Sequence, residues 1–237
     1  MRTLLTAAML SVLVTAGTAG QQPKAPVDFT GVWVSVVTED WKWRMLTPAR
    51  GDVLGIPLNP QAQKMAESWD YAKDIAAGNE CKAYGAAHVL RLPTRVRISW
   101  QDDSTLKIET DAGRQTRLLH FDRTRQPGAR SPQGHSTAEW VDGAALKVVT
   151  TNLREGYLRK NGVPHSQNAV VTEYFDRFPV PGAGDWFVVK TIVDDPAYLT
   201  GPYIVSSNFM REPDESKWRP SACEVDPPLV PAKPDVR

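Results

Sequence analysis

The strongest constraint on the fold is a strict alternation of apolar and polar side chains in residues 94–121. In the first run, Thr94–Gln101, the apolar side chains fall on every second position, at Val96, Ile98 and Trp100. Successive side chains of a strand point to opposite faces, so this run predicts a strand with one buried face. Two similar runs follow after short turns, Thr105–Thr110 and Arg114–Phe121. The segment therefore predicts three antiparallel strands.

Similar patterns elsewhere raise the total to about nine strands. They lie at Gly31–Val37, on either side of Asp142-Gly143, and at Asn168–Phe178, Asp185–Asp195 and Tyr203–Glu212. A meander of this size leaves two exposed edges unless it closes on itself. We therefore predict an all-β fold, a closed antiparallel up-and-down barrel. A β-sandwich is the alternative, with crossovers at residues 121–136 and 152–168.

One stretch departs from the β pattern. Asn59–Gly78 begins with a capping residue and Pro60, and its apolar residues recur at helical spacing. It predicts a short helical insertion, as one helix or a broken pair. The predicted barrel domain covers residues 28–224, and residues 225–237 form a proline-rich tail expected to be disordered.

Residues 1–20 have the layout of a secretory signal peptide. Arg2 precedes an apolar run, and small residues follow it. The run is too short to span a membrane, which takes about 20 residues. We expect an exported protein, periplasmic or secreted. Cys81 and Cys223, the two cysteines of the chain, are then expected to form a disulfide, with two free buried thiols as the alternative.

Charge and motifs exclude several function classes. Loss of Arg2 with the leader leaves 27 of the 28 basic residues against 27 acidic ones, without a basic block. Nucleic acid and anionic lipid are therefore not expected partners. The four histidines form no metal-binding motif, and there is no nucleophile elbow, phosphate loop or dinucleotide fingerprint. We predict no metal and no organic cofactor.

The first predicted strand carries a short motif, Gly31-Val32-Trp33. At the start of an exported meander it resembles the Gly-x-Trp signature of the lipocalin-like (calycin) barrels. The resemblance implies that Trp33 closes the barrel base and that Arg211, on the last strand, stacks on it. Residues 134–178 also resemble a group of exported bacterial proteins, and this likeness implies a fold and a compartment without an activity.

Titratable side chains on the predicted strands are the candidates for catalysis. Glu173 shares a strand face with Val171 and Phe175, and the sequence leaves open whether that face is inside the barrel. Lys190 poses the same question among apolar neighbours. His135 enters a strand at the predicted rim, where an imidazole could transfer protons. Glu173 and His135, assisted by Tyr157 or Lys190, could serve an isomerase, lyase, hydratase or hydrolase without a cofactor.

The first hypothesis for function is binding of a small hydrophobic or aromatic molecule in the barrel cavity. The candidate contacts are aromatic residues and one cation: Trp41, Trp43, Trp100, Tyr174 and Arg177. The long connection Thr150–Ser166 could add a lid with Tyr157, suited to an aromatic or carboxylate-bearing ligand, or be an ordinary loop. The enzyme is the second hypothesis, and an envelope protein with a filled barrel is the third. The sequence leaves the oligomeric state open.

Overall fold

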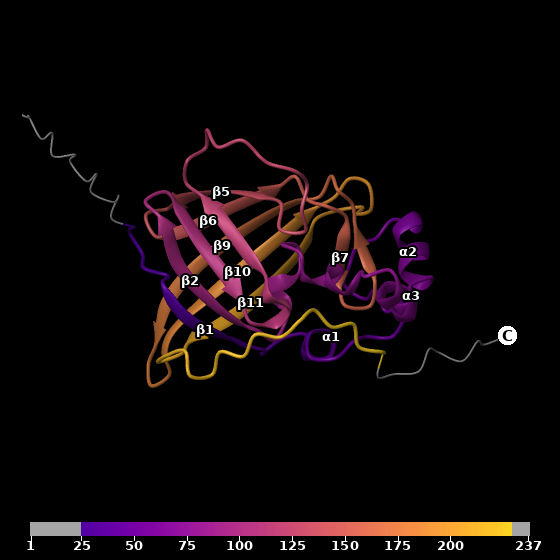
Figure 1. The fold of residues 1–237 in the computed structure, drawn as a ribbon, viewed down its shortest axis with the longest axis horizontal. Coiled ribbons are helices and arrows are strands. Elements are labelled where there is room, and N and C mark those ends of the chain that lie inside the picture. The colour runs from indigo at the N-terminus through magenta and orange to yellow at the C-terminus, as the bar shows by residue number, and fades with distance from the viewer. Residues whose placement is uncertain (1–24, 229–237) are drawn as a thin grey trace, which may run out of the picture.

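Nine strands close into a barrel in the computed structural model, which describes residues 25–228 (Figure 1). The closed order confirms the predicted barrel and excludes the sandwich. Around the barrel the strands are β1 (Gly31–Val36), β11 (Tyr203–Arg211), β10 (Gly184–Asp194), β9 (Val170–Val180), β6 (Ala145–Thr151), β5 (His135–Val141), β4 (Thr116–His120), β3 (Thr105–Thr110) and β2 (Arg95–Asp102). The predicted signal peptide, and residues 229–237 of the predicted tail, lie outside the described residues.

The up-and-down order is broken at one place. β4 and β5 run parallel, with Leu119 opposite Ser136, whereas the other neighbours in the barrel are antiparallel. Parallel neighbours cannot be joined by a tight turn, because the chain must return to the end where it started. The loop between β4 and β5 makes this return along the outside of the barrel (Figure 1). The predicted antiparallel up-and-down order is confirmed for the other neighbours and is wrong at this one pair.

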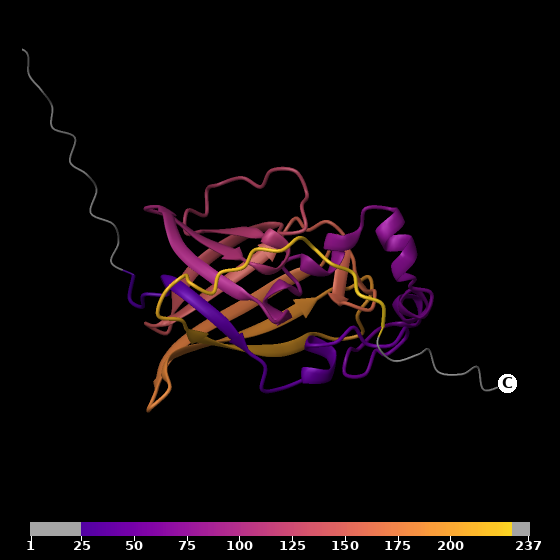
Figure 2. The same cartoon turned by 60° about the horizontal axis from the view of Figure 1, so that its bottom comes forward.

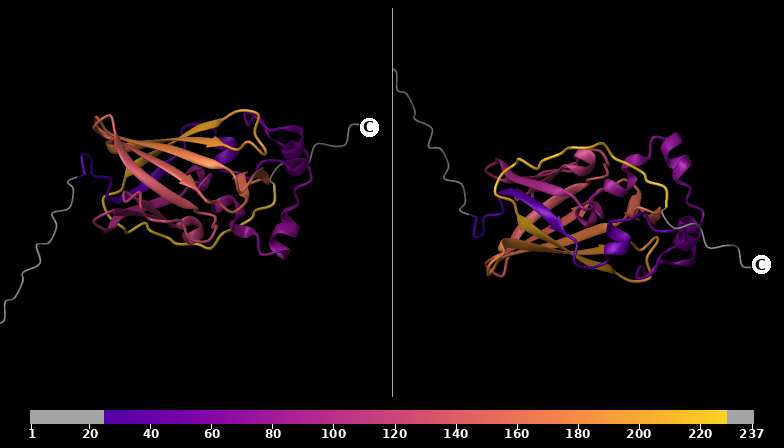
Figure 3. Two further views of the ribbon diagram at one scale, coloured as in Figure 1. Left: turned by 90° about the horizontal axis from the view of Figure 1, so that it is seen from above. Right: turned by 90° about the horizontal axis from the view of Figure 1, so that it is seen from below.

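Helices and a separate two-stranded hairpin cover one end of the barrel (Figures 1 and 3). The predicted helical insertion is a broken pair, α2 (Pro60–Glu67) and α3 (Tyr71–Ala76). Asn59 and Asp70 cap these helices, because their side chains accept hydrogen bonds from the amides of Ala62 and Ala72. The hairpin comprises β7 (Gly156–Arg159) and β8 (Val163–His165). None of the described helices is long and apolar enough to cross a membrane.

The connection from α3 to β2 plugs the barrel. Residues 83–92 are all buried. Val89 and Leu90 pack in the aromatic core with Trp33 and the barrel phenylalanines, whereas Ala86 and Ala87 pack in a second apolar cluster next to the helices and hairpin. Outside the insertion, the short helices of residues 25–228 are α1 (Trp41–Arg44) and the 3-10 turns η1 (Glu80–Tyr84), η2 (Val89–Arg91) and η3 (Ala112–Arg114). Side chains, rather than an open lumen, fill this part of the barrel.

Trp33 closes the opposite end. It is fully buried, and the guanidinium carbons of Arg211 and Arg177 lie 5.3 Å and 5.7 Å from its ring centroid. Gly31 has a φ of 119°, and a Cβ there would come within 3.0 Å of Nη2 of Arg211. Glycine therefore allows the approach of the guanidinium to the strand entry. Arg211 lies on Trp33, as the resemblance implies.

After β11 the chain runs back along the outside of the barrel as a strap, residues 212–228 (Figure 2). The predicted disulfide between Cys81 and Cys223 fastens the strap to η1, with 5.1 Å between the Cα atoms. Arg97 stacks on Trp218 with 4.9 Å to the ring centroid, and the Glu224 amide donates to the Tyr84 hydroxyl at 3.0 Å. The strap thus links the barrel wall to its capped end.

Candidate functional site

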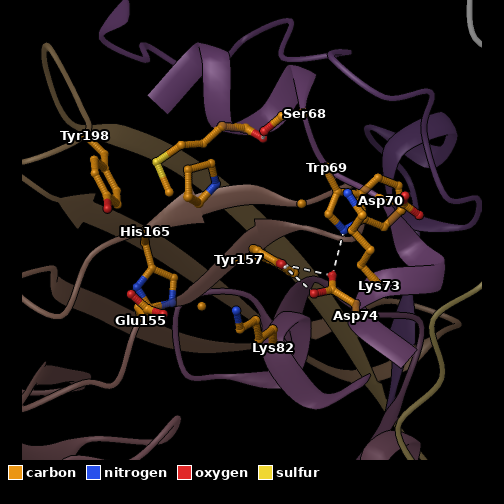
Figure 4. A pocket seen from close by; sticks show the side chains of 14 residues that line it. Ser68, Trp69, Asp70, Lys73, Asp74, Lys82, Glu155, Tyr157, His165 and Tyr198 are labelled. Carbon is orange, nitrogen blue, oxygen red and sulfur yellow. Dashed lines mark hydrogen bonds between the residues drawn. The ribbon is translucent and has the colours of Figure 1, made fainter. Parts of the chain in front are cut away.

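A cavity of about 250 Å³ lies between the helices α2 and α3 and the β7–β8 hairpin (Figure 4). We call it the cap cavity. Three aromatic side chains line it, Trp69, Tyr157 and Tyr198, together with Met65 and Pro164. An apolar cavity of about 150 Å³ can hold benzene, so the cap cavity has room for one substituted ring.

Asp74 of α3 holds one wall of the cap cavity in place (Figure 4). The Tyr157 hydroxyl donates to its carboxylate, with 3.0 Å and 2.9 Å to the two oxygens, and Nε1 of Trp69 donates to Oδ2 at 2.8 Å. Burial first, then the hydrogen bond and the charge of Asp74, raise the pKa of Tyr157. Tyr157 is therefore a fixed hydrogen-bond donor, and both aromatic rings have one orientation.

The turn that joins β7 and β8 leaves space for the indole ring of Trp69. Gly162 has a φ of 76°, and a Cβ built on it would lie 2.1 Å from ring atoms of Trp69. Any side chain at this position would occupy the space of the indole, in a backbone conformation that residues other than glycine rarely adopt. The segment Lys160-Asn161-Gly162 therefore forms the turn, and its glycine leaves the space that Trp69 fills in the cavity wall.

His165 of β8 lines the cap cavity and is 1% exposed. Its Nδ1 lies 3.1 Å from the carbonyl oxygen of Ser166, which can only accept, so Nδ1 carries the proton and Nε2 has a free lone pair. Ser166 is fixed by Asp195, which accepts from its amide at 2.6 Å and its hydroxyl at 2.7 Å. Burial lowers the pKa of His165, so the imidazole is neutral near pH 7.

A second cavity, of about 560 Å³, adjoins the first. We call it the basic cavity. The two share four residues, Lys82, Glu155, Gly156 and His165. Arg154 lines the basic cavity but not the cap cavity. Nζ of Lys82 lies 5.4 Å from the ring centroid of Tyr157. At the junction Gly156 packs closely on His165, since a Cβ there would lie 2.7 Å from Nε2 of His165.

The predicted catalytic residues have separate environments. Glu173 is fully buried inside the barrel, and Arg117, which is 1% exposed, pairs with it. Lys190 is exposed on the outer wall, with Nζ 4.6 Å from the ring centroid of Tyr174. His135 stacks on His120 with 5.3 Å between the ring centroids. Of the four, Tyr157 is the one that lines the cap cavity.

The predicted ligand contacts are also distributed over the molecule. Trp41 is 62% exposed, and Nε1 of Trp43 donates to Asp52 at 3.0 Å. Trp100 packs on Phe121, with 5.4 Å between the ring centroids. Arg177 pairs with Asp185 at 2.7 Å in addition to its contact with Trp33, and Tyr174 lies on the outer wall. None of these five residues lines either of the two cavities.

Sequence reasoning missed most of the side chains that line the cap cavity. Trp69 appears in the sequence as a helical apolar position, and Asp74 and Lys82 follow it without a motif. The one signal was the long connection Thr150–Ser166, which contributes Arg154, Tyr157 and His165 to the two cavities. Long connections in a small domain often carry function, and this one does supply cavity walls.

Metal ligands are not clustered in the part of the chain that the structure describes, since no group of three or more histidine, cysteine and acidic side chains converges there. Comparisons with known proteins give no further guidance, because no family model, curated protein or solved structure matches the chain.

Proposed function

We propose that the protein binds a small aromatic molecule in the cap cavity. The observation that carries the proposal is the wall of Trp69, Tyr157 and Tyr198, two of whose rings are fixed by hydrogen bonds to the buried Asp74. Rings held in one orientation lose little conformational entropy when a ligand stacks on them. The aromatic core and the plug occupy the barrel interior, so the proposed ligand lies at its capped end.

We also propose that the protein works in an oxidising compartment, periplasmic or extracellular. The disulfide between Cys81 and Cys223 supports this, because such bonds persist mainly outside the cytosol. The packing of Arg211 on Trp33 supports a distant relationship to the lipocalin-like barrels. The parallel β4–β5 pair and the plug are departures from the up-and-down plan that this resemblance implies.

Binding can be tested with two half-buried tyrosines that differ in position. Tyr198 lines the cap cavity, whereas Tyr174 lies on the outer wall. A panel of small aromatic compounds is titrated against the wild type, Tyr198→Ala and Tyr174→Ala, with tryptophan fluorescence as the signal. We expect binding to weaken by at least about tenfold in Tyr198→Ala only, which is about 1.4 kcal/mol. Equal affinities in the two variants, or no binding to the wild type, would contradict the proposal.

A second candidate function is catalysis on the bound molecule, and His165 favours it. Its Nε2 is free to accept a proton at the junction of the two cavities, and the imidazole is held by the Ser166 carbonyl. A compound that binds is incubated with the wild type and with His165→Asn, and products are sought by mass spectrometry. Turnover by the wild type alone would support a general base at His165, and binding without turnover would leave the protein a carrier.

A further inference from the structure

We infer that the ligand is an aromatic carboxylate, with its ring in the cap cavity and its carboxylate in the basic cavity. This inference rests on the proposed function, since it assumes that the cap cavity takes the ring. The two cavities share Lys82, Glu155, Gly156 and His165, so they lie side by side, and one elongated molecule can contact both. A bipartite site of this kind favours a ligand with two chemically different parts.

The charges of the two walls differ in sign. The cap cavity is lined by three carboxylates and two ammonium groups, from Asp70, Asp74 and Glu155 and from Lys73 and Lys82. The basic cavity is lined by Lys82 and Arg154 against Glu155 alone. His165 adds no charge to either side, since its buried ring is neutral. The net charge of one positive unit in the basic cavity suits a singly charged anion such as a carboxylate.

The two cations of the basic cavity have no partner of their own. Among residues 25–228, no carboxylate forms an ion pair with Lys82 or Arg154. The backbone holds both in place, because η1 carries Lys82 beside the disulfide and the Arg154 amide donates to the Ser131 carbonyl at 2.8 Å. A ligand carboxylate would therefore meet two available donors without breaking an existing ion pair.

Lys82 connects the two halves of the site. Its Nζ lies 5.4 Å from the ring centroid of Tyr157, one of the aromatic residues of the cap cavity, and Lys82 also lines the basic cavity. A cation in this position can pair with a carboxylate that is a short linker away from a ring stacked on Tyr157. The geometry thus favours a carboxylate separated from the ring over one attached directly to it.

The test compares 3-phenylpropionate with its neutral amide, 3-phenylpropionamide, by isothermal titration calorimetry at low salt. For the wild type we expect the acid to bind at least about tenfold more tightly, a factor that corresponds to about 1.4 kcal/mol. In Lys82→Gln and in Arg154→Gln the preference should fall toward one. In the control Arg123→Gln, which changes an exposed arginine of the loop between β4 and β5, the preference should persist. The thermal midpoint of each variant shows whether it is folded.

The outcomes separate this inference from the proposed function. If acid and amide bind equally well, or both fail while another aromatic compound binds at Tyr198, the aromatic site stands and the carboxylate assignment is wrong. If the acid is preferred but Lys82→Gln and Arg154→Gln keep that preference, the basic cavity is not the anion site. If no aromatic compound of any charge binds, the proposed function itself fails.

Discussion

Arg117 and Glu173 form an ion pair inside the barrel, between the aromatic core and the apolar cluster next to the helices and hairpin. Nη1 of Arg117 lies 3.0 Å from Oε1 of Glu173, and Nη2 pairs with the other carboxylate oxygen. Val171 lies in the cluster near the cap and Phe175 in the aromatic core, so Glu173 marks the boundary between them. The hydroxyl of Thr150 accepts a further bond from Arg117 at 3.3 Å.

Removal of one partner should leave the other charge buried and unpaired. We expect Glu173→Gln to lower the free energy of unfolding by about 3–5 kcal/mol. The double variant Arg117→Met/Glu173→Leu should recover most of this loss, because no charge then remains to be desolvated. Urea unfolding of the three proteins checks both values. A loss below about 1 kcal/mol in Glu173→Gln would show that the pair contributes little.

Alanine substitutions at two glycines with the same φ angle should separate the cost of backbone strain from the cost of a steric clash. Gly162 and Gly182 both have a φ of 76°, but a Cβ meets Trp69 at the first and nothing within 4 Å at the second. Gly182→Ala should cost about 1 kcal/mol from the backbone alone. Gly162→Ala should cost clearly more and should also weaken aromatic binding, because Trp69 must move. Thermal unfolding measures the first effect and fluorescence titration the second, and equal costs would contradict the crowding.

Acid should destabilise the protein through His88. The ring is 4% exposed, and neither of its nitrogens has a hydrogen-bond partner in the described part of the chain. Burial first, then the charges of Arg91, Lys160, Arg159 and Arg44, lower its pKa well below the usual value. The unfolded chain takes up a proton near pH 6.5 and the folded protein does not, so the stability is present above that pH and is lost below it.

The loss should approach about 1.4 kcal/mol per pH unit for this one group below pH 6. Urea unfolding between pH 5 and pH 8 measures it. In His88→Leu the curve should be flatter by this slope, and the variant should exceed the wild type in stability at pH 5. Parallel curves for the two proteins would mean that His88 does not control the pH dependence.

Reduction of the disulfide should loosen the strap. Cys81 and Cys223 are 142 residues apart in the sequence, so their bond restricts a long loop of the unfolded chain. Its removal in Cys81→Ser/Cys223→Ser should cost up to about 5 kcal/mol. Unfolding followed by fluorescence measures the cost. Proteolysis within residues 212–228 should also become faster, and an unchanged cleavage rate would show that the contacts of Arg97 with Trp218 hold the strap alone.

The sequence predicted the barrel well because strand alternation is local. Val96, Ile98 and Trp100 show the inward face of β2 without any knowledge of the partner strand. The same reasoning left the face of Glu173 open, because the answer depends on Arg117, which is 56 residues away and lies in a strand whose own pattern is apolar in part. Partners that meet only across a barrel leave no trace in local spacing.

The cap cavity was hidden for a related reason. Its walls come from α2, α3, β7 and β8, and the packing of Trp69 on Gly162 unites segments about 90 residues apart. The plug was hidden too, because a continuous buried segment without periodicity can equally be read as a loop. The connection Thr150–Ser166 was singled out by its length and its tyrosine, which are properties that the sequence states directly.

The pairing of β1 with β11 has a consequence for synthesis of the chain. Trp33 lies opposite Arg211, so the first strand of the barrel can be paired along both edges only after the last strand has been made. β2 can cover one edge of β1 early, but the other edge stays open until almost all of the chain has emerged. Folding is therefore expected to be slow and late, and the nascent protein should depend on chaperones that shield exposed strand edges.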